Sequence, residues 1–284
     1  MHKICLIRGA GDIATGTIQK LVHAGFKCVV TEVSNPSSIR RNVSLSEAVY
    51  DGKANVEDIE AVLCDDLEKI DEYLEKYNPV VIVDPNISIL NKMKFDVIVD
   101  AILAKKNTGL SKNMADITIA LGPGFEAGVD CDVVIETMRG HDLARIIERG
   151  FAQKNTKIPG NINGYSIERV IYSEFDGKFT HIKNISDVVQ KGQVIAKVNN
   201  NNIYATLDGV IRGMIRDNFE VTKGLKIIDI DPRYEEVKNS FTISDKARAI
   251  GGAVLEAIMM LENRRNNNAK WCFITNVQIF RRRI

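Results

Sequence analysis

The chain has 284 residues, of which 45% are hydrophobic and 26% are charged, so it can bury a full core and form two domains or one elaborated domain. Its 38 basic and 37 acidic residues leave a net charge of +1, which excludes a general attraction to nucleic acid or to an anionic membrane. The five cysteines are scattered without a CxxC pair, and the apolar stretches fall short of the ~20 residues of a membrane span, so we expect a cytoplasmic protein.

The first 150 residues alternate short β-branched runs with helical patterns. The runs are almost continuously apolar, as expected for strands that are covered on both faces of a parallel sheet. We therefore predict an α/β fold, with a Rossmann-like domain over residues 1–152. The predicted strands are 4–7, 28–32, 80–83, 97–99, 117–121 and 133–135, and the predicted helices are 13–24, 67–77 and 141–149.

A different period begins after Pro159-Gly160, where short strands alternate with Lys-Gly and Asp-Gly turns. The stretches VVQKGQVIAKV and EVTKGLKIIDI echo each other, a quasi-repeat typical of lipoyl and biotinyl carrier modules. We predict a small β half-barrel over residues 153–235. The tip of its central hairpin is the asparagine run 199–202 and has no lysine to carry a prosthetic group, so we interpret the module as a scaffold or docking surface.

A C-terminal helix is predicted over residues 236–265, with Ser244 as its N-cap. Gly251 and Gly252 inside this helix cost about 2 kcal/mol relative to two alanines. Close packing against another backbone, or the approach of a ligand, would compensate for that cost. Residues 266–284 lack a clear period and are expected to be a poorly ordered tail.

The stretch IRGAGDIATG places Gly9, Gly11 and Ala14 as G-x-G-x-x-A between a strand and a helix. Such a turn lets backbone approach a phosphate, which the N–H groups of the helix start then attract. Glu32 closes the second strand, where related folds hold a ribose. The motif predicts binding of a nucleotide or another phosphate-bearing ligand, and its alternative is a glycine turn that only packs. Asp12 counts against an ordinary dinucleotide site, because its carboxylate would repel a phosphate.

Polar and glycine residues also follow the other predicted strands, at the edge where ligands bind in open parallel sheets. We expect them to converge on one crevice. His141 there could act as an acid or base, or cap a helix and bond a ligand. The sequence indicates neither a metal cluster nor a catalytic triad, so it predicts a binding site more clearly than a reaction. These residues are Asp100, Lys105, Gly122, Gly124, Glu136, Arg139 and His141.

The strings IRGAGDIATG, SSIRRNVSLSEAVYDG, ALGPGFEAG, ETMRGHDLARII and ISDKARAIGGAVLEAI resemble the YqeB-like family, over about residues 3–262. That family is associated with selenium-dependent molybdenum hydroxylase systems. The resemblance implies an accessory or maturation protein for hydroxylases of the xanthine dehydrogenase type, acting in cofactor handling or selenium insertion. It adds Arg40, Arg41, Lys246 and Arg248 to the candidate residues, and arginines are suited to capture a pterin phosphate or another oxyanion.

Two other functions remain open from the sequence. One is an NAD(P)-dependent oxidoreductase, with Glu32 on the ribose and His141 or Lys105 as proton donor. The other is a structural adaptor that binds no small molecule. For an accessory protein, the expected partners are a selenium-dependent molybdenum hydroxylase and a phosphate-bearing ligand, either a nucleotide or a molybdopterin-type cofactor.

Overall fold

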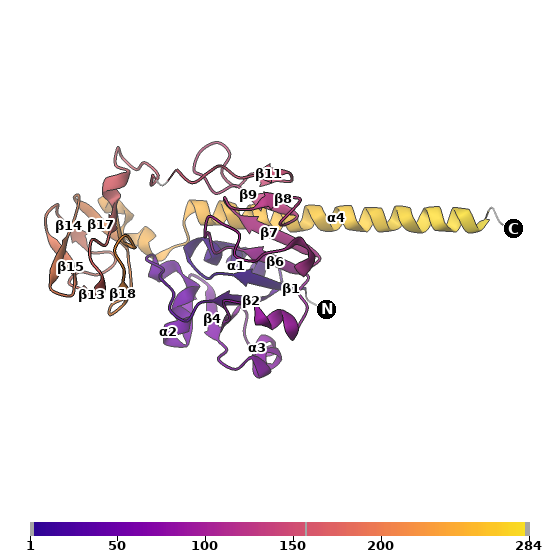
Figure 1. Cartoon of the computed structure of the whole chain (residues 1–284), viewed down its shortest axis with the longest axis horizontal. Helices are drawn as coiled ribbons and strands as arrows, with labels where there is room; N and C mark the ends of the chain where they lie inside the picture. Colours follow the sequence, from indigo (N-terminus) through magenta and orange to yellow (C-terminus); the bar gives the residue numbers. More distant parts are fainter. Residues whose placement is uncertain (1–2, 157, 282–284) are drawn as a thin grey trace.

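A computed structural model describes residues 3–156 and 158–281 of the chain. An α/β domain occupies the first half and a β module follows it (Figure 1). The last helix, α4 (Asp245–Arg281), returns from the module, crosses the α/β domain and continues past it (Figure 1).

The α/β domain is built on a nine-stranded sheet in the order β10-β9-β7-β6-β1-β2-β5-β4-β3. Neighbouring strands are parallel except for the outer pairs β3/β4 and β9/β10. Within it, the order β5-β2-β1-β6-β7-β9 is that of doubly wound nucleotide-binding sheets. The prediction of a mostly parallel α/β sheet is therefore confirmed. The strands are β1 (Ile4–Arg8), β2 (Lys27–Glu32), β3 (Lys53–Val56), β4 (Ile59–Leu63), β5 (Val80–Val83), β6 (Val97–Asp100), β7 (Ile117–Leu121), β9 (Val133–Ile135) and β10 (Ile146–Ile147).

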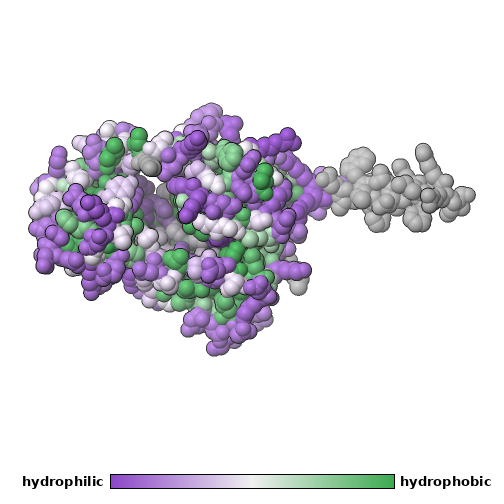
Figure 2. Space-filling view, in the orientation of Figure 1, coloured by the Kyte–Doolittle hydropathy of each residue, from purple (hydrophilic) through white to green (hydrophobic). Residues whose placement is uncertain are grey.

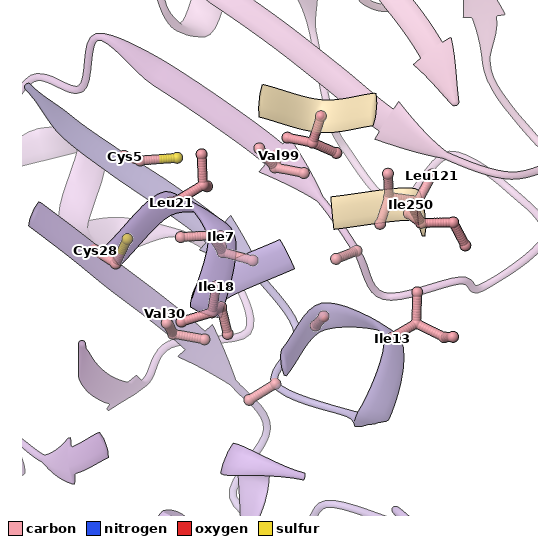
Figure 3. Packing of buried hydrophobic residues seen from close by; sticks show 14 of the residues in the cluster. Cys5, Ile7, Ile13, Ile18, Leu21, Cys28, Val30, Val99, Leu121 and Ile250 are labelled. Carbon is pink, nitrogen blue, oxygen red and sulfur yellow. The ribbon is translucent and has the colours of Figure 1, made fainter. Parts of the chain in front are cut away.

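Two helices cover one face of this sheet. Ile18 and Leu21 of α1 (Asp12–His23) lie over Ile7 and Val30 of the two central strands (Figure 3). Ile250 of α4 belongs to the same buried cluster. On the other face lie α3 (Ile70–Lys76) and 3₁₀ turns such as η3 (Leu67–Lys69) and η4 (Ser88–Asn91).

The predicted helix over residues 141–149 is wrong. Residues 141–144 form turns, Ile146–Ile147 pair with β9 as strand β10, and Gly150–Phe151 pair with β8 (Glu126–Ala127) as β11. The β-branched pair completes the sheet edge, and α4 already covers the face that a helix here would occupy.

The sequence pattern left strands β3 and β4 unassigned. They form a hairpin around Glu57, which has φ 53°. Glutamate is an unusual residue for this left-handed conformation, so the Asn-Gly or Asp-Gly signal of a hairpin is missing. A short helix, α2 (Ala48–Asp51), precedes the hairpin.

The β module consists of two four-stranded sheets, β12-β19-β17-β14 and β16-β15-β13-β18, around a core of its own. An all-β module is thus confirmed, whereas its likeness to a carrier half-barrel stays a prediction. The predicted hairpin tip joins β15 to β16. The strands are β12 (Val170–Tyr172), β13 (Gly177–His181), β14 (Val188–Val189), β15 (Val194–Val198), β16 (Asn201–Tyr204), β17 (Gly209–Met214), β18 (Glu220–Val221) and β19 (Lys226–Asp231).

Hydrogen bonds and ion pairs join the module to the α/β domain. The Met214 N–H donates to the Ile39 carbonyl at 2.7 Å, and Arg41 Nε donates to the Met214 carbonyl at 2.8 Å. Arg216 makes two bonds to the Asp51 carboxylate and lies over the Tyr50 ring. Arg41 therefore ties the two parts together instead of facing a ligand.

Helices α1 and α4 touch backbone to backbone. A Cβ at Gly251 would lie 2.4 Å from the Gly16 carbonyl oxygen, and a Cβ at Gly16 would lie 2.6 Å from the Ala247 oxygen. Ser244 caps α4, because its Oγ accepts from the Ala247 N–H at 3.2 Å. The close packing expected for the glycine pair is confirmed at Gly251. Gly252 has no neighbour within 4 Å of its Cβ position.

Beyond residue 265 the backbone of α4 stays helical to Arg281, where the sequence led us to expect a tail. Residues 282–284 lie outside the described part of the chain. That the segment is poorly ordered stays a prediction.

The adjacent glycines provide a matched test of this packing. Gly251→Ala places a methyl group against backbone and is expected to lower the free energy of unfolding by about 1–3 kcal/mol. Gly252→Ala meets open space and is expected to raise it by about 0.5–1 kcal/mol, through helix propensity. Urea denaturation measures both, and equal effects of the two substitutions would contradict the close crossing.

Candidate functional site

A cavity of about 340 Å³ lies where β1 and β6 end, at the point where the strand order reverses. Ligands bind at this point in doubly wound sheets. We call it the glycine-loop cavity, and Gly9, Gly11, Ala14 and Ile102 are among its lining residues. The N–H groups of residues 11–14 have no protein acceptor among the residues that the structure describes. The predicted turn therefore presents free donors to an open space.

Gly9 and Gly11 have different roles in this loop. Gly9 has φ 92°, and a Cβ there would lie 3.2 Å from the Ala101 oxygen, so it lets β1 turn against the loop after β6. A Cβ at Gly11 would meet only Ser38 Oγ, at 3.5 Å. Gly11 therefore borders the cavity without being required for packing.

The loop itself occupies both carboxylate oxygens of Glu32. Oε2 accepts from the Ala10 N–H at 2.8 Å, and Oε1 accepts from the Val33 N–H at 2.9 Å. Burial raises the pKa of Glu32, whereas these two bonds oppose the rise. Glu32 lines the cavity but serves first to hold the glycine turn.

Asp12, the first residue of α1, pairs with Arg40 across 3.5 Å. Arg40 is only 8% exposed, one of its Nη atoms donates to the Asn239 carbonyl, and its Nε has no partner. Burial lowers the pKa of Arg40, and the positive charge of Arg212 lowers it further, whereas Asp12 acts in the opposite direction. Asp12 lines the glycine-loop cavity on one side and a second cavity on the other.

This second cavity, of about 300 Å³, lies between the glycine loop, the β module and the start of α4, and we call it the basic crevice. In Figure 2 the surface is recessed where the module meets the α/β domain, with hydrophilic residues around the recess. The acidic side chains that line the crevice are Asp12 and Asp229, and the basic ones are Arg40, Arg139, Arg169, Arg212, Lys226 and Lys246. Basic groups outnumber acidic ones there, although the chain as a whole is nearly neutral.

Arg139 and Lys246 also line a neighbouring cavity of about 440 Å³. Lys105 is a further lining residue of that cavity. Arg139 bonds both oxygens of Asp245 at 2.8 Å and holds the pKa of that carboxyl well below its ordinary value. Lys246 has neither an ion pair nor a side-chain hydrogen bond within the described residues. Burial lowers the pKa of Lys246.

Asp100 and Glu136 are occupied by structural contacts. Asp100 and Arg8 are 1% and 2% exposed and form an ion pair of 2.6 Å between β6 and β1. Burial raises the pKa of Asp100, and Arg8 opposes this. Glu136 accepts from the N–H groups of Met138 and Gln153 at 2.7 and 2.8 Å. Asp100 and Glu136 therefore stabilise the strand ends and loops that border the site.

Gly122 and Gly124 also have packing roles. Their Cβ positions would lie 2.6 Å from Thr137 Oγ1 and 2.5 Å from the Lys106 nitrogen, and both have positive φ. His141 is exposed in a turn and lines none of the four cavities at this edge. Arg248 lines a further cavity of about 510 Å³ beside the crevice.

Sequence reasoning missed Arg169, Arg212 and Lys226 of the β module. Arg212 interrupts the apolar run of β17, and a charge in such a run is a signal that it faces a polar cavity. The sequence does not show which surface lies opposite Arg212, because that surface belongs to the α/β domain, which is distant in the chain.

The described residues contain neither a candidate metal cluster nor a candidate membrane-spanning helix. No group of three His, Cys, Asp or Glu side chains is placed to hold a metal ion in that part of the chain. Within the same residues, no helix is both long and apolar enough to cross a membrane.

The chain is 47% identical over 260 residues to the uncharacterized protein YqeB of Escherichia coli (strain K12). The alignment covers 92% of this chain and 48% of the relative, so the chain spans about half of the relative's length. This identity supports the resemblance to YqeB-like proteins. No family model matches the chain.

Among solved structures, a succinylglutamate desuccinylase from Silicibacter sp. TM1040 is 12% identical, with a TM-score of 0.24 over 81% of this chain and 84% of its own. The ectoine utilization protein EutE from Ruegeria pomeroyi is 11% identical, with a TM-score of 0.25 over 81% and 86%. Likeness at this level carries no argument about fold or function.

The assignment of Asp100 to structure can be tested by substitution. Asp100→Asn leaves Arg8 as a buried charge without its counterion, so the free energy of unfolding is expected to fall by about 3–5 kcal/mol. The double substitution Arg8→Met with Asp100→Leu removes both charges and should recover much of this loss. Guanidinium denaturation measures the three proteins, and an Asp100→Asn variant of unchanged stability would refute the structural role.

Proposed function

We propose that the chain binds a small phosphate-bearing ligand at this sheet edge and acts as an accessory protein in the maturation of selenium-dependent molybdenum hydroxylases of the xanthine dehydrogenase type. The observation that supports ligand binding is the glycine-loop cavity at the switch point, with free N–H groups on one side and the basic crevice on the other. Support for the client enzyme comes from the resemblance to YqeB-like proteins alone.

A nucleotide and a molybdopterin-type cofactor both fit the chemistry of the site. Each combines an uncharged ring system with phosphate groups, and the two adjoining cavities offer a less polar and a strongly basic compartment. Their volumes fall in the range of small-molecule sites. Arg40, Arg169 and Arg212 would hold the phosphate, and a molybdopterin-type cofactor would bring the metal chemistry that the client enzyme needs.

An NAD(P)-dependent oxidoreductase has less support. Glu32, which would bond an adenosine ribose, accepts one backbone N–H at each oxygen and keeps a further acceptor position on each, so its contacts favour neither function. His141, one of the suggested proton donors, is exposed and outside the cavities. Fluorescence titration with NADH and with NADPH separates the two functions, because an oxidoreductase would bind one of them tightly and we expect tight binding of neither.

The glycine-loop cavity can be blocked without disturbing the fold. Gly11→Asp fills part of the cavity, while aspartate is a favourable N-cap for α1, so the fold should be retained. We expect the ligand that co-purifies with the wild-type chain, detected by native mass spectrometry, to be lost from this variant. Gly252→Asp is the matched control, since it adds the same charge at a site with open space. Retention of the ligand by both variants, or its absence from the wild-type chain, would count against the cavity.

The client can be tested in cells that use a selenium-dependent molybdenum hydroxylase. Deleting the gene of this chain is expected to yield hydroxylase with less selenium or molybdenum per protein, measured by elemental analysis. The wild-type chain and Gly252→Asp should restore the content, and Gly11→Asp should not. Full selenium and molybdenum content in the deletion strain would refute the maturation role.

A further inference from the structure

We propose that the basic crevice binds an oxyanion group of the diphosphate class, carrying more than one negative charge, while the uncharged part of the same ligand lies in the glycine-loop cavity. This inference deepens the proposed function and rests on it for the uncharged part. It differs from the usual dinucleotide arrangement, in which the diphosphate lies on the helix start beside the glycine loop.

Two deeply buried arginines form part of the lining of the crevice. Arg40 and Arg169 are 8% and 4% exposed, both line the crevice, and the Nε of each has no hydrogen-bond partner among the described residues. Each arginine has a single carboxylate partner in the lining, Asp12 for Arg40 and Asp229 for Arg169, so the charges of these pairs balance and the excess positive charge comes from the other cations. Each guanidinium is held in place by its other contacts, Arg40 to Asn239 and Arg169 to the Gly160 carbonyl.

Among the residues that the structure describes, three further cations of the lining have a distant counterion or none. Arg212 approaches Asp231 only to 3.8 Å, and that carboxylate already accepts from Arg233 at 2.8 and 2.9 Å. Within the described residues, neither Lys226 nor Lys246 forms an ion pair or a side-chain hydrogen bond. The pairs Arg40–Asp12 and Arg169–Asp229 use the two acidic groups of the lining. A single negative charge would leave this cluster positive, whereas a diphosphate matches it.

Asp12 fixes the orientation of the ligand. Its carboxylate stands at the first position of α1, between the two cavities, and repels a phosphate from the helix start. A hydroxyl or amino group of the ligand can donate to it. The ligand therefore carries its charge on the crevice side of Asp12 and a hydrogen-bond donor beside it.

Titration calorimetry of the full chain with pyrophosphate at low ionic strength tests the crevice directly. We expect pyrophosphate to bind, and orthophosphate to bind more weakly. Arg212→Gln and Lys226→Gln should each weaken pyrophosphate binding about tenfold or more, because each removes a charged donor. Lys197→Gln, on an exposed strand position of the module away from the crevice, removes the same charge and should change little. Two crevice variants are used so that a folding defect in one leaves the test intact.

The outcomes separate this inference from the proposed function. Gly11 does not line the crevice, so Gly11→Asp should weaken pyrophosphate binding less than Arg212→Gln does, while it loses the co-purifying ligand. If wild type binds no pyrophosphate, or Arg212→Gln and Lys197→Gln bind it equally, the inference fails even where Gly11→Asp loses the ligand. If pyrophosphate depends on Arg212 but Gly11→Asp keeps its ligand, the crevice stands and the glycine-loop site fails.

Discussion

The contact between the backbones of α1 and α4 at Gly16 and Gly251 positions the whole site. Asp12 lies one turn before Gly16, and Lys246 lies five residues before Gly251, so the crossing sets both helix starts side by side. Sliding one helix past the other by a single turn would move Lys246 by about 5.4 Å and take it out of the crevice. Side chains larger than hydrogen at the crossing would separate the helices. Glycine lowers the stability of a helix interior, but here it allows the start of α1 and the start of α4 to lie next to each other.

Electrostatics then divides the site into compartments. Arg8 and Asp100 neutralise each other inside the sheet, and Glu32 and Glu136 are satisfied by backbone N–H groups. These acidic groups stabilise the loops and leave little negative charge free at the surface of the site. Positive charge remains in excess in the basic crevice, where arginines from the β module meet Arg40 and Lys246. The nearly neutral composition of the chain hides this local imbalance.

The sequence predicted those parts of the fold that local pattern determines. Continuous apolar runs identified the central strands, the Gly9 turn identified the strand-to-helix junction, and the glycine pair of the last helix indicated a close backbone contact. The predicted helix at 141–149 failed because the sheet edge and α4 decide the conformation of that segment. The hairpin at Glu57 was hidden because its turn uses a residue that rarely adopts positive φ. Of the residues named beforehand, the structure places Gly9, Gly11, Asp12, Arg40 and Arg139, together with Lys246 from the family resemblance, around the glycine-loop cavity and the basic crevice, and their role in binding stays a prediction.

The arginines of the module could not be found in this way, because their role depends on which of its two sheets faces the α/β domain. Sheet β12-β19-β17-β14 carries Arg212 and Lys226, and Met214 at the end of its strand β17 bonds Ile39. The hairpin tip at residues 199–202 belongs to the opposite sheet. The asparagine tip and the crevice residues Arg212 and Lys226 therefore lie on different sheets of the module.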